Sequence, residues 1–256
     1  MTRLLKAGLL LLTLVVTYLI MLPTTWMDAV LQRASQGTLA MTSTTGTFWR
    51  GEGSLQALLP SGEVVTLTPV SWNIAPVELL ALKVHIVALS TRDNKPVLNA
   101  TLGLGETYIQ EAKLELPAAL LGVLSPTLRA AALSGQLALQ ANDVRFGGNR
   151  AAGKAQAFWK AAGSSLSRIR PMGSYLLDLN GQSNGLDFHL STIRGPLTLT
   201  GSGGWRPGKP PDIRVTAVPE ESAHQDLAPL LRMLGRETSP GTYQLTIDQN
   251  VQAITP

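Results

Sequence analysis

Few side chains in this 256-residue chain are of the kinds that perform chemistry: it has three histidines and no cysteine. The absence of cysteine excludes disulfides, thiolate nucleophiles and zinc–thiolate sites. His85 falls in an alternating segment, and no other metal-ligand residue lies near it, so we interpret it as a structural histidine. Asp187 and His189 would share one face of a strand, which starts a metal site only if a third ligand comes from elsewhere.

The glycine-rich stretches 51–54 and 201–204 fit no catalytic loop. A nucleophilic serine is typically held in Gly-x-Ser-x-Gly, and a phosphate-binding loop precedes a helix, whereas neither stretch meets either condition. We interpret both as turn glycines. Carboxylates are few and scattered, and four of them near residues 212–226 lie in a polar, proline-containing segment. We therefore predict that the protein is no enzyme and that it has no catalytic, cofactor-binding or metal-binding residues.

The N-terminus carries an apolar run that could anchor the rest of the chain in a membrane. Leu4 to Leu22 is almost wholly apolar, and a bilayer crossing needs about 20 such residues. Arg3 and Lys6 precede or begin the run, so the positive-inside rule predicts a cytoplasmic tip and export of the rest. A cleaved signal peptide is the alternative, but the bulky Trp26-Met27 pair and Pro23 follow the run where small residues are expected.

Charge and composition do not indicate a nucleic-acid binder. Only 15% of residues are charged, and the net charge of +4 comes from scattered Lys and Arg. No basic stripe appears, so we predict no nucleic-acid partner. We predict an anchor with a cytoplasmic tip at residues 1–24, a short helix and linker at 25–36, and one β-rich exported domain at 37–256.

After residue 37 the pattern becomes that of strands. Residues 64–68, 82–87, 135–140 and 195–200 alternate or carry β-branched side chains, and glycine, proline or polar residues bound them. The fold class that we predict is mainly β: one N-terminal transmembrane helix, then a curved antiparallel β-meander with a few short helices. The helices are expected at 25–35, at two Pro-x-x-Leu-Leu segments (76–80 and 117–121), and at 225–234 with Gly235 as C-cap. The paired leucines would lie on one face and close an open end of the sheet.

Residues 45–55, TGTFWRGEGSL, combine glycines, aromatic residues and an arginine. We interpret them as a structural corner in which glycines permit tight turns, Trp49 packs inward, and Arg50 and Glu52 point outward. The remaining tryptophans near strands are most simply core or sheet-end residues, and the alternative is a stripe that contacts a partner or lipid.

Several short motifs follow one another along the chain, and their residues are Gly46, Trp49, Gly51, Trp72, Pro76, Leu79, Leu80, Gly195 and Pro196. Their order resembles a known family, the type II secretion system protein N, and the resemblance gives these residues a structural role. The chain departs from the family at Ile74, where a second tryptophan is common, and in its irregular spacing at 147–163. Weaker matches follow in the expected order at 133–137, 171–175, 230–235 and 241–243.

The resemblance implies a non-enzymatic component of the machine that exports folded proteins from the periplasm across the outer membrane. It implies a single-pass inner-membrane protein, with its bulk in the periplasm and other envelope proteins of the secretion system as partners. The residues leave a second reading open, in which the tethered β domain binds or transfers lipid through an apolar groove. A continuous apolar face of the sheet would favour lipid, and a filled core with a polar surface would favour assembly.

Overall fold

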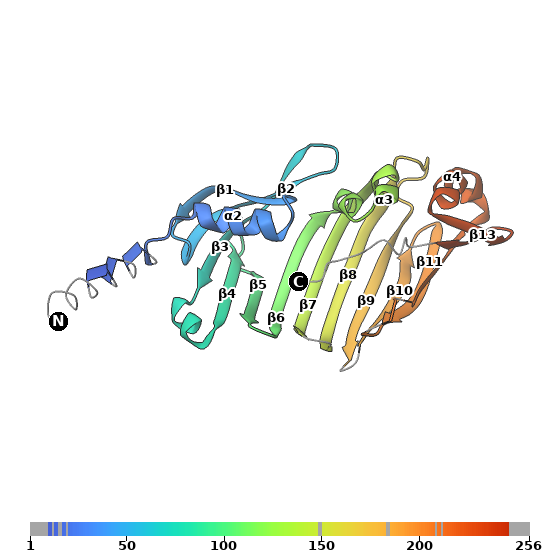
Figure 1. Cartoon of the computed structure of the whole chain (residues 1–256). Coiled ribbons are helices and arrows are strands. Elements are labelled where there is room, and N and C mark those ends of the chain that lie inside the picture. Colours follow the sequence, from blue (N-terminus) through green and yellow to red (C-terminus); the bar gives the residue numbers. More distant parts are fainter. Residues whose placement is uncertain are drawn as a thin grey trace. The chain divides into compact units, whose positions relative to one another are not determined.

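A computed structural model of the chain describes residues 10, 11, 13, 14, 17, 18, 20–147, 150–182, 185–207, 209, 210 and 212–245. Internal contacts divide the chain into two compact units. Unit 1 comprises residues 1–58 and 64–97, and unit 2 comprises residues 59–63 and 98–256. Both consist mainly of antiparallel strands with a few short helices, which are labelled in Figure 1. The mainly β class predicted from the alternating segments is thus confirmed.

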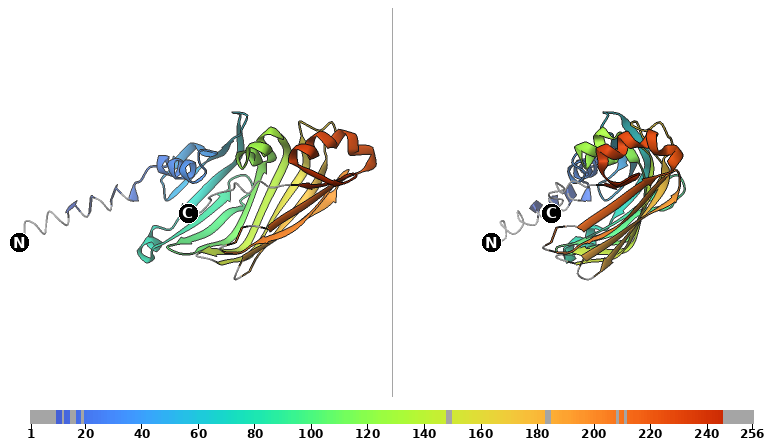
Figure 2. Two further views of the ribbon diagram at one scale, coloured as in Figure 1. Left: turned by 45° about the vertical axis from the view of Figure 1, so that its right-hand side comes forward. Right: turned by 90° about the vertical axis from the view of Figure 1, so that its right-hand side faces the viewer.

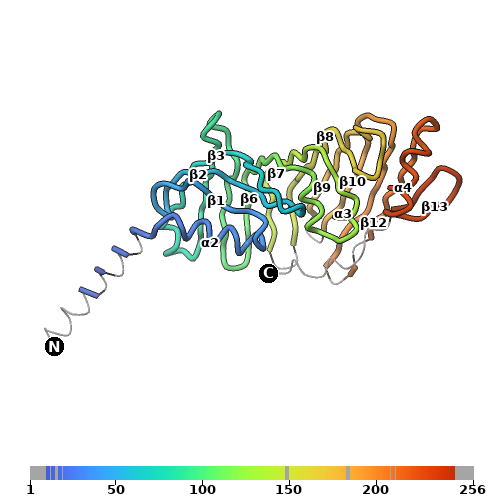
Figure 3. Tube along the Cα trace, turned by 90° about the horizontal axis from the view of Figure 1, so that it is seen from above, coloured from blue at the N-terminus to red at the C-terminus, as the bar shows by residue number. Residues whose placement is uncertain are grey.

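Unit 1 is a four-stranded meander in the order β1-β2-β3-β4. Its buried face comes from alternate residues, such as Leu55 and Ala57 on β2 and Val70 and Trp72 on β3, as expected for half-buried strands. Figure 3 shows α2 running beside β1. The elements of unit 1 are α2 (Thr25–Ala34), β1 (Leu39–Gly46), β2 (Arg50–Leu58), β3 (Val64–Ile74), η1 (Pro76–Ala81) and β4 (Lys83–Ser90).

Helix α2 closes the outer edge of β1. The Met41 amide donates a hydrogen bond to Asp28 Oδ1 (2.7 Å), and the Leu39 amide donates to Ser35 Oγ (2.9 Å). These amides are two residues apart, so both point to the side of β1 away from β2. Side chains of α2 and of its C-terminal cap thus occupy donors that would otherwise be free to pair with another strand.

The described part of unit 2 contains ten strands in the order β5-β6-β7-β8-β9-β10-β11-β12-β14-β13. The last two exchange places because the chain passes through α4 before it returns to pair β14 with β12. Figure 2 shows that α3 and α4 lie at the same end of these strands and that the sheet of unit 2 is bowed. Its elements are β5 (Pro96–Gly103), β6 (Thr107–Pro117), η2 (Ala118–Val123), α3 (Pro126–Ala130), β7 (Leu133–Gly147), β8 (Arg150–Ser164), β9 (Gly173–Gln182), β10 (Gly185–Arg194), β11 (Leu197–Trp205), β12 (Asp212–Pro219), η3 (Glu221–Ala223), α4 (His224–Leu234), β13 (Gly235–Ser239) and β14 (Thr242–Leu245).

The strand register of unit 2 separates an apolar face from a polar one, because residues directly opposite each other on neighbouring strands share a face. One row of such partners is apolar, and the next row along the strands is polar. The apolar row is Leu114, Leu139, Ala157, Leu177, Leu190, Gly201 and Val215. The polar row is Lys113, Gln140, Gln156, Asp178, His189, Ser202 and Arg214.

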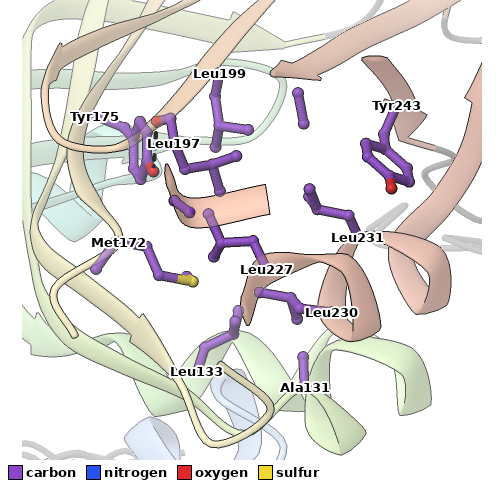
Figure 4. Packing of buried hydrophobic residues seen from close by; sticks show 13 residues of the cluster. Ala131, Leu133, Met172, Tyr175, Leu197, Leu199, Leu227, Leu230, Leu231 and Tyr243 are labelled. Carbon is purple, nitrogen blue, oxygen red and sulfur yellow. Dashed lines mark hydrogen bonds between the residues drawn. The ribbon is translucent and has the colours of Figure 1, made fainter. Parts of the chain in front are cut away.

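The main core of unit 2 forms where α4 packs on the apolar face (Figure 4). Leu227, Leu230 and Leu231 of α4 are buried against Leu197, Leu199 and Ala217 of the sheet and against both tyrosines shown in the figure, Tyr175 and Tyr243. Most of the apolar row lies outside this cluster and stays half-buried. The face is therefore continuous, but the helix covers only part of it.

Several local predictions need correction. The glycines at 51–54 and 201–204 lie inside β2 and β11 and not in turns. On β11 they leave room for both neighbouring strands, since a Cβ on Gly203 would collide with the Asp212 carbonyl on β12 and would be 2.6 Å from the Phe188 ring on β10. The two Pro-x-x-Leu-Leu segments do form short helices, which are of the 3-10 type, and Gly235 is the C-cap of α4 as predicted, with an extended backbone (φ −167°) that begins β13.

Most of the apolar run at 4–22 lies outside the described residues. Among the residues that are described, no helix is long and apolar enough to cross a membrane. The transmembrane helix stays a prediction.

Candidate functional site: the clasp at the end of the apolar run

The loop between β1 and β2 holds the end of the apolar N-terminal run. The Phe48 amide donates a hydrogen bond to the Leu22 carbonyl (2.8 Å), and Pro23 forms an isolated antiparallel bridge with Thr47. One residue further on, the hydroxyls of Thr24 and Thr44 lie 3.0 Å apart. We call residues 22–24 and 44–51 together the clasp. It fixes the point at which the run ends relative to the sheet of unit 1.

The motif glycines make the clasp possible. Gly46 has φ +96°, a conformation that side chains disfavour, and it turns the chain out of β1. Gly51 lies opposite Trp72 on β3, and a Cβ at Gly51 would be 2.5 Å from the indole. Trp72 is only 4% exposed and donates from Nε1 to the Phe48 carbonyl (2.9 Å). The motif around Gly46 and Gly51 and the motif that contains Trp72 are far apart in the sequence, and they pack together around the Trp72 indole.

The prediction that Trp49 packs into the core is wrong. It lies in the bend before β2, half-buried, with its ring edge-on to Phe48 at a centroid distance of 5.1 Å. It lines a cavity of about 750 Å³ together with Ile20 of the apolar run and with residues of η1. Arg50 and Glu52 do point outward together, as predicted from their positions two residues apart on one strand.

The leucines of η1 close no end of the sheet. Pro76 begins the turn, Leu82 ends it in a left-handed conformation (φ 54°), and Glu78 reaches His85 Nδ1 on β4 (3.3 Å). The turn is thus fixed to the meander while its apolar side chains stay open. Leu80 is 89% and Val77 is 74% exposed, and Leu79 and Leu82 are exposed as well.

The same motif behaves differently in unit 2. There Ala118 is fully buried in η2, and Leu121 packs against the main core. Because both segments share proline and paired leucines at the same spacing, the motif itself does not decide whether the leucines are covered. No neighbouring described element covers the leucines of η1, so they are exposed.

The remaining motif residues serve unit 2. Gly195, with φ +126°, turns the chain between β10 and β11, and a Cβ there would be 2.7 Å from the Met172 carbonyl. The Pro196 carbonyl accepts a hydrogen bond from the Glu220 amide (2.8 Å). The nine motif residues therefore do not form one site: seven belong to unit 1 around the clasp and η1, and two form a turn of unit 2.

The side chains considered for chemistry do not converge. Asp187 pairs with Arg206 (2.6 Å) and His85 with Glu78, while His189 lies exposed on β10. Within the described part of the chain, no group of three or more His, Asp or Glu residues is arranged to hold a metal ion. Sequence reasoning also missed the role of Asp28, because its partner Met41 lies 13 residues away.

These features define a class of protein: an antiparallel β-meander whose first hairpin holds the end of an apolar N-terminal run. A family model described as type II secretion system (T2SS), protein N, matches residues 38–246. The chain belongs to this family, which confirms the resemblance of its motifs and makes it a type II secretion component of the cell envelope. Searches among curated proteins and among solved structures returned no match.

Proposed function

We propose that the protein is a non-enzymatic inner-membrane component of the type II secretion system. In this proposal the apolar run crosses the membrane once, the short N-terminus is cytoplasmic, and both units lie in the periplasm. The observation that carries the proposal is the family match over residues 38–246. The clasp supports it physically, because hydrogen bonding of Leu22 to Phe48 would hold unit 1 directly against the membrane surface.

Its partners are other envelope proteins of the secretion system. The hydrogen bonds made by the two edge strands, β1 and β13, favour one of them as the edge to which a partner strand adds. The outer amides of β1 at Leu39 and Met41 already bond to Ser35 and Asp28. At the other end of the strand order, β13 is the last strand and its Arg236 and Glu237 are exposed. We infer that β13 is the edge open to strand addition, which gives main-chain hydrogen bonds to a partner.

In-cell photocrosslinking tests this proposal. A photoreactive residue at Glu237 on β13 should capture proteins of the secretion machine, whereas one at Thr45 on β1 should capture few. Deletion of the gene should lower secretion, and the native chain should restore it. Normal secretion without the protein, together with no secretion protein among the products, would contradict the proposal.

A lipid-binding function is the second candidate, and the continuous apolar row of unit 2 favours it. Most of that row is half-buried outside the α4 core, which would suit acyl chains better than water. Leu177 on the apolar row and its neighbour Asp178 on the polar row form a matched pair for the same crosslinker. Lipid adducts at Leu177 and not at Asp178 would support this function, and equal labelling at both would refute it.

A further inference from the structure

We propose that Trp49, Val77, Leu79, Leu80 and Leu82, here called the apolar wedge, insert into the outer interface of the lipid bilayer. The wedge would be a membrane contact additional to the apolar run. The inference rests on the proposed membrane anchoring, and it adds the surface of unit 1 that meets the lipid.

The position of the wedge follows from the clasp. The apolar run ends at Leu22, whose carbonyl bonds to the Phe48 amide, and Trp49 is the next residue. Ile20, within the last turn of the run, lines the same 750 Å³ cavity as Trp49, Val77 and Leu80. If the run crosses the bilayer, its final turn lies near the boundary between acyl chains and head groups, so the wedge lies at that depth too. Tryptophan is enriched at this level.

The chemistry of the wedge suits lipid. Four of its side chains are aliphatic, and Leu80 and Val77 are 89% and 74% exposed, so water would contact most of their surface. Transfer of such surface out of water is favourable in proportion to its area. Arg50, which also lines the cavity, and Lys83, which follows Leu82 in the chain, are exposed cations next to residues of the wedge. They match the anionic head groups of a phospholipid surface.

The carboxylate within η1 does not oppose insertion. Glu78 faces His85 on β4 (3.3 Å), so it is turned toward the sheet and partly covered. Arg50 lines the cavity together with Trp49, Val77 and Leu80, so a cationic side chain and apolar side chains lie together there, as in interfacial segments that bury an apolar face about 5–10 Å into the boundary region.

The absence of cysteine allows the depth of single positions to be measured in the full chain. Val77→Cys and Val64→Cys, each labelled with an environment-sensitive fluorophore, form a matched pair of exposed valines in unit 1. Val64 is the first residue of β3, Val77 follows the last residue of that strand by three positions, and the 11 residues of β3 span roughly 30 Å. The labelled chains are reconstituted in vesicles of phosphatidylethanolamine and phosphatidylglycerol with brominated acyl chains. A third reporter at Leu14 reads the apolar run.

We expect the Val77 reporter to be quenched several-fold more than the Val64 reporter, most strongly by bromine near the head groups. The Leu14 reporter should be quenched by bromine deep in the chains. Adding Leu80→Asp to the Val77 reporter should reduce its quenching toward the Val64 level.

Three outcomes would overturn the inference, and they are distinguishable. Deep quenching at Leu14 with no excess at Val77 over Val64 would leave the anchor intact and refute the wedge. No quenching at Leu14 would refute the membrane anchoring itself, and the wedge with it. Quenching at Val77 that is unaffected by Leu80→Asp would show that the reporter, and not the wedge, inserts.

Discussion

Two tyrosines in the core of unit 2 differ in one hydrogen bond. The rings of Tyr175 and Tyr243 are 2% and 0% exposed. The Tyr175 hydroxyl donates to the Leu197 carbonyl (3.0 Å), whereas the Tyr243 hydroxyl has no partner among the described residues. Replacing each tyrosine by phenylalanine keeps the ring and removes only the hydroxyl. The pair therefore separates the contribution of the hydrogen bond from that of packing.

The Leu197 carbonyl depends on the Tyr175 hydroxyl. The Leu197 amide bonds to Met172, so its carbonyl points to the same side of the strand, where the tyrosine hydroxyl lies. Tyr175→Phe leaves this acceptor buried and unpaired, which costs about 1–3 kcal/mol of unfolding free energy. Tyr243→Phe removes a buried hydroxyl without a partner and should change that free energy by less than about 0.5 kcal/mol, or raise it.

Hydrogen exchange measured by mass spectrometry on the full chain in detergent micelles reads this difference locally. In Tyr175→Phe, peptides of β9 and β11 should lose roughly 5- to 150-fold of their protection, as a change of about 1–3 kcal/mol requires. In Tyr243→Phe, protection of the same peptides should be unchanged or higher. Equal losses in both variants would show that the Tyr175 hydrogen bond contributes nothing specific, and the reasoning would fail.

The same residue predicts a dependence on pH. Burial raises the pKa of Tyr175 well above its ordinary value of 10.0, because the charged phenolate would be desolvated. The folded state therefore keeps this proton at a pH where the unfolded chain has lost it. The contribution to stability is complete below about pH 10 and is lost as the pH rises above it. Denaturation between pH 9 and 11 should show a smaller loss of stability in Tyr175→Phe than in the native chain.

Two further substitutions test the clasp and the covered edge. Gly51→Ala should destabilise unit 1 by about 1–3 kcal/mol, because its methyl group would displace the buried indole opposite it. Gly105→Ala is the control, since there is open space at its Cβ, and it should not lower stability. Thermal unfolding of both variants measures the difference in stability. Asp28→Ala should leave the Met41 amide unpaired at the edge of β1 and promote self-association, seen by light scattering. Gln32→Ala, which removes only the exposed partner of Asp28 Oδ2, is the control, and equal association in both would refute the role of Asp28.

Local patterns were enough to predict most elements. Alternation and β-branched residues identified strands such as β3 and β7, and the apolar spacing near residues 25–35 and 225–234 identified α2 and α4. These signals are local because the period of side chains along a strand or helix is a property of the backbone. The motif order identified the family on the same basis.

The position of the glycines was harder to predict. Gly51 and Gly203 looked like turn residues, yet they lie in strands and make room for Trp72 and Phe188. The reason lies on a neighbouring strand, so no window of sequence around either glycine contains it.

What the sequence by itself determined is the β class, the approximate segments, the family and the presence of an apolar run. Only the tertiary structure decided that Leu121 is covered while Leu80 is open, that Asp28 closes the edge of β1, and that the motif loop holds the end of the run. Each of these outcomes depends on contacts between residues far apart along the chain. Such neighbours determine burial and hydrogen bonding, so the same local motif has covered leucines in one place and exposed leucines in another.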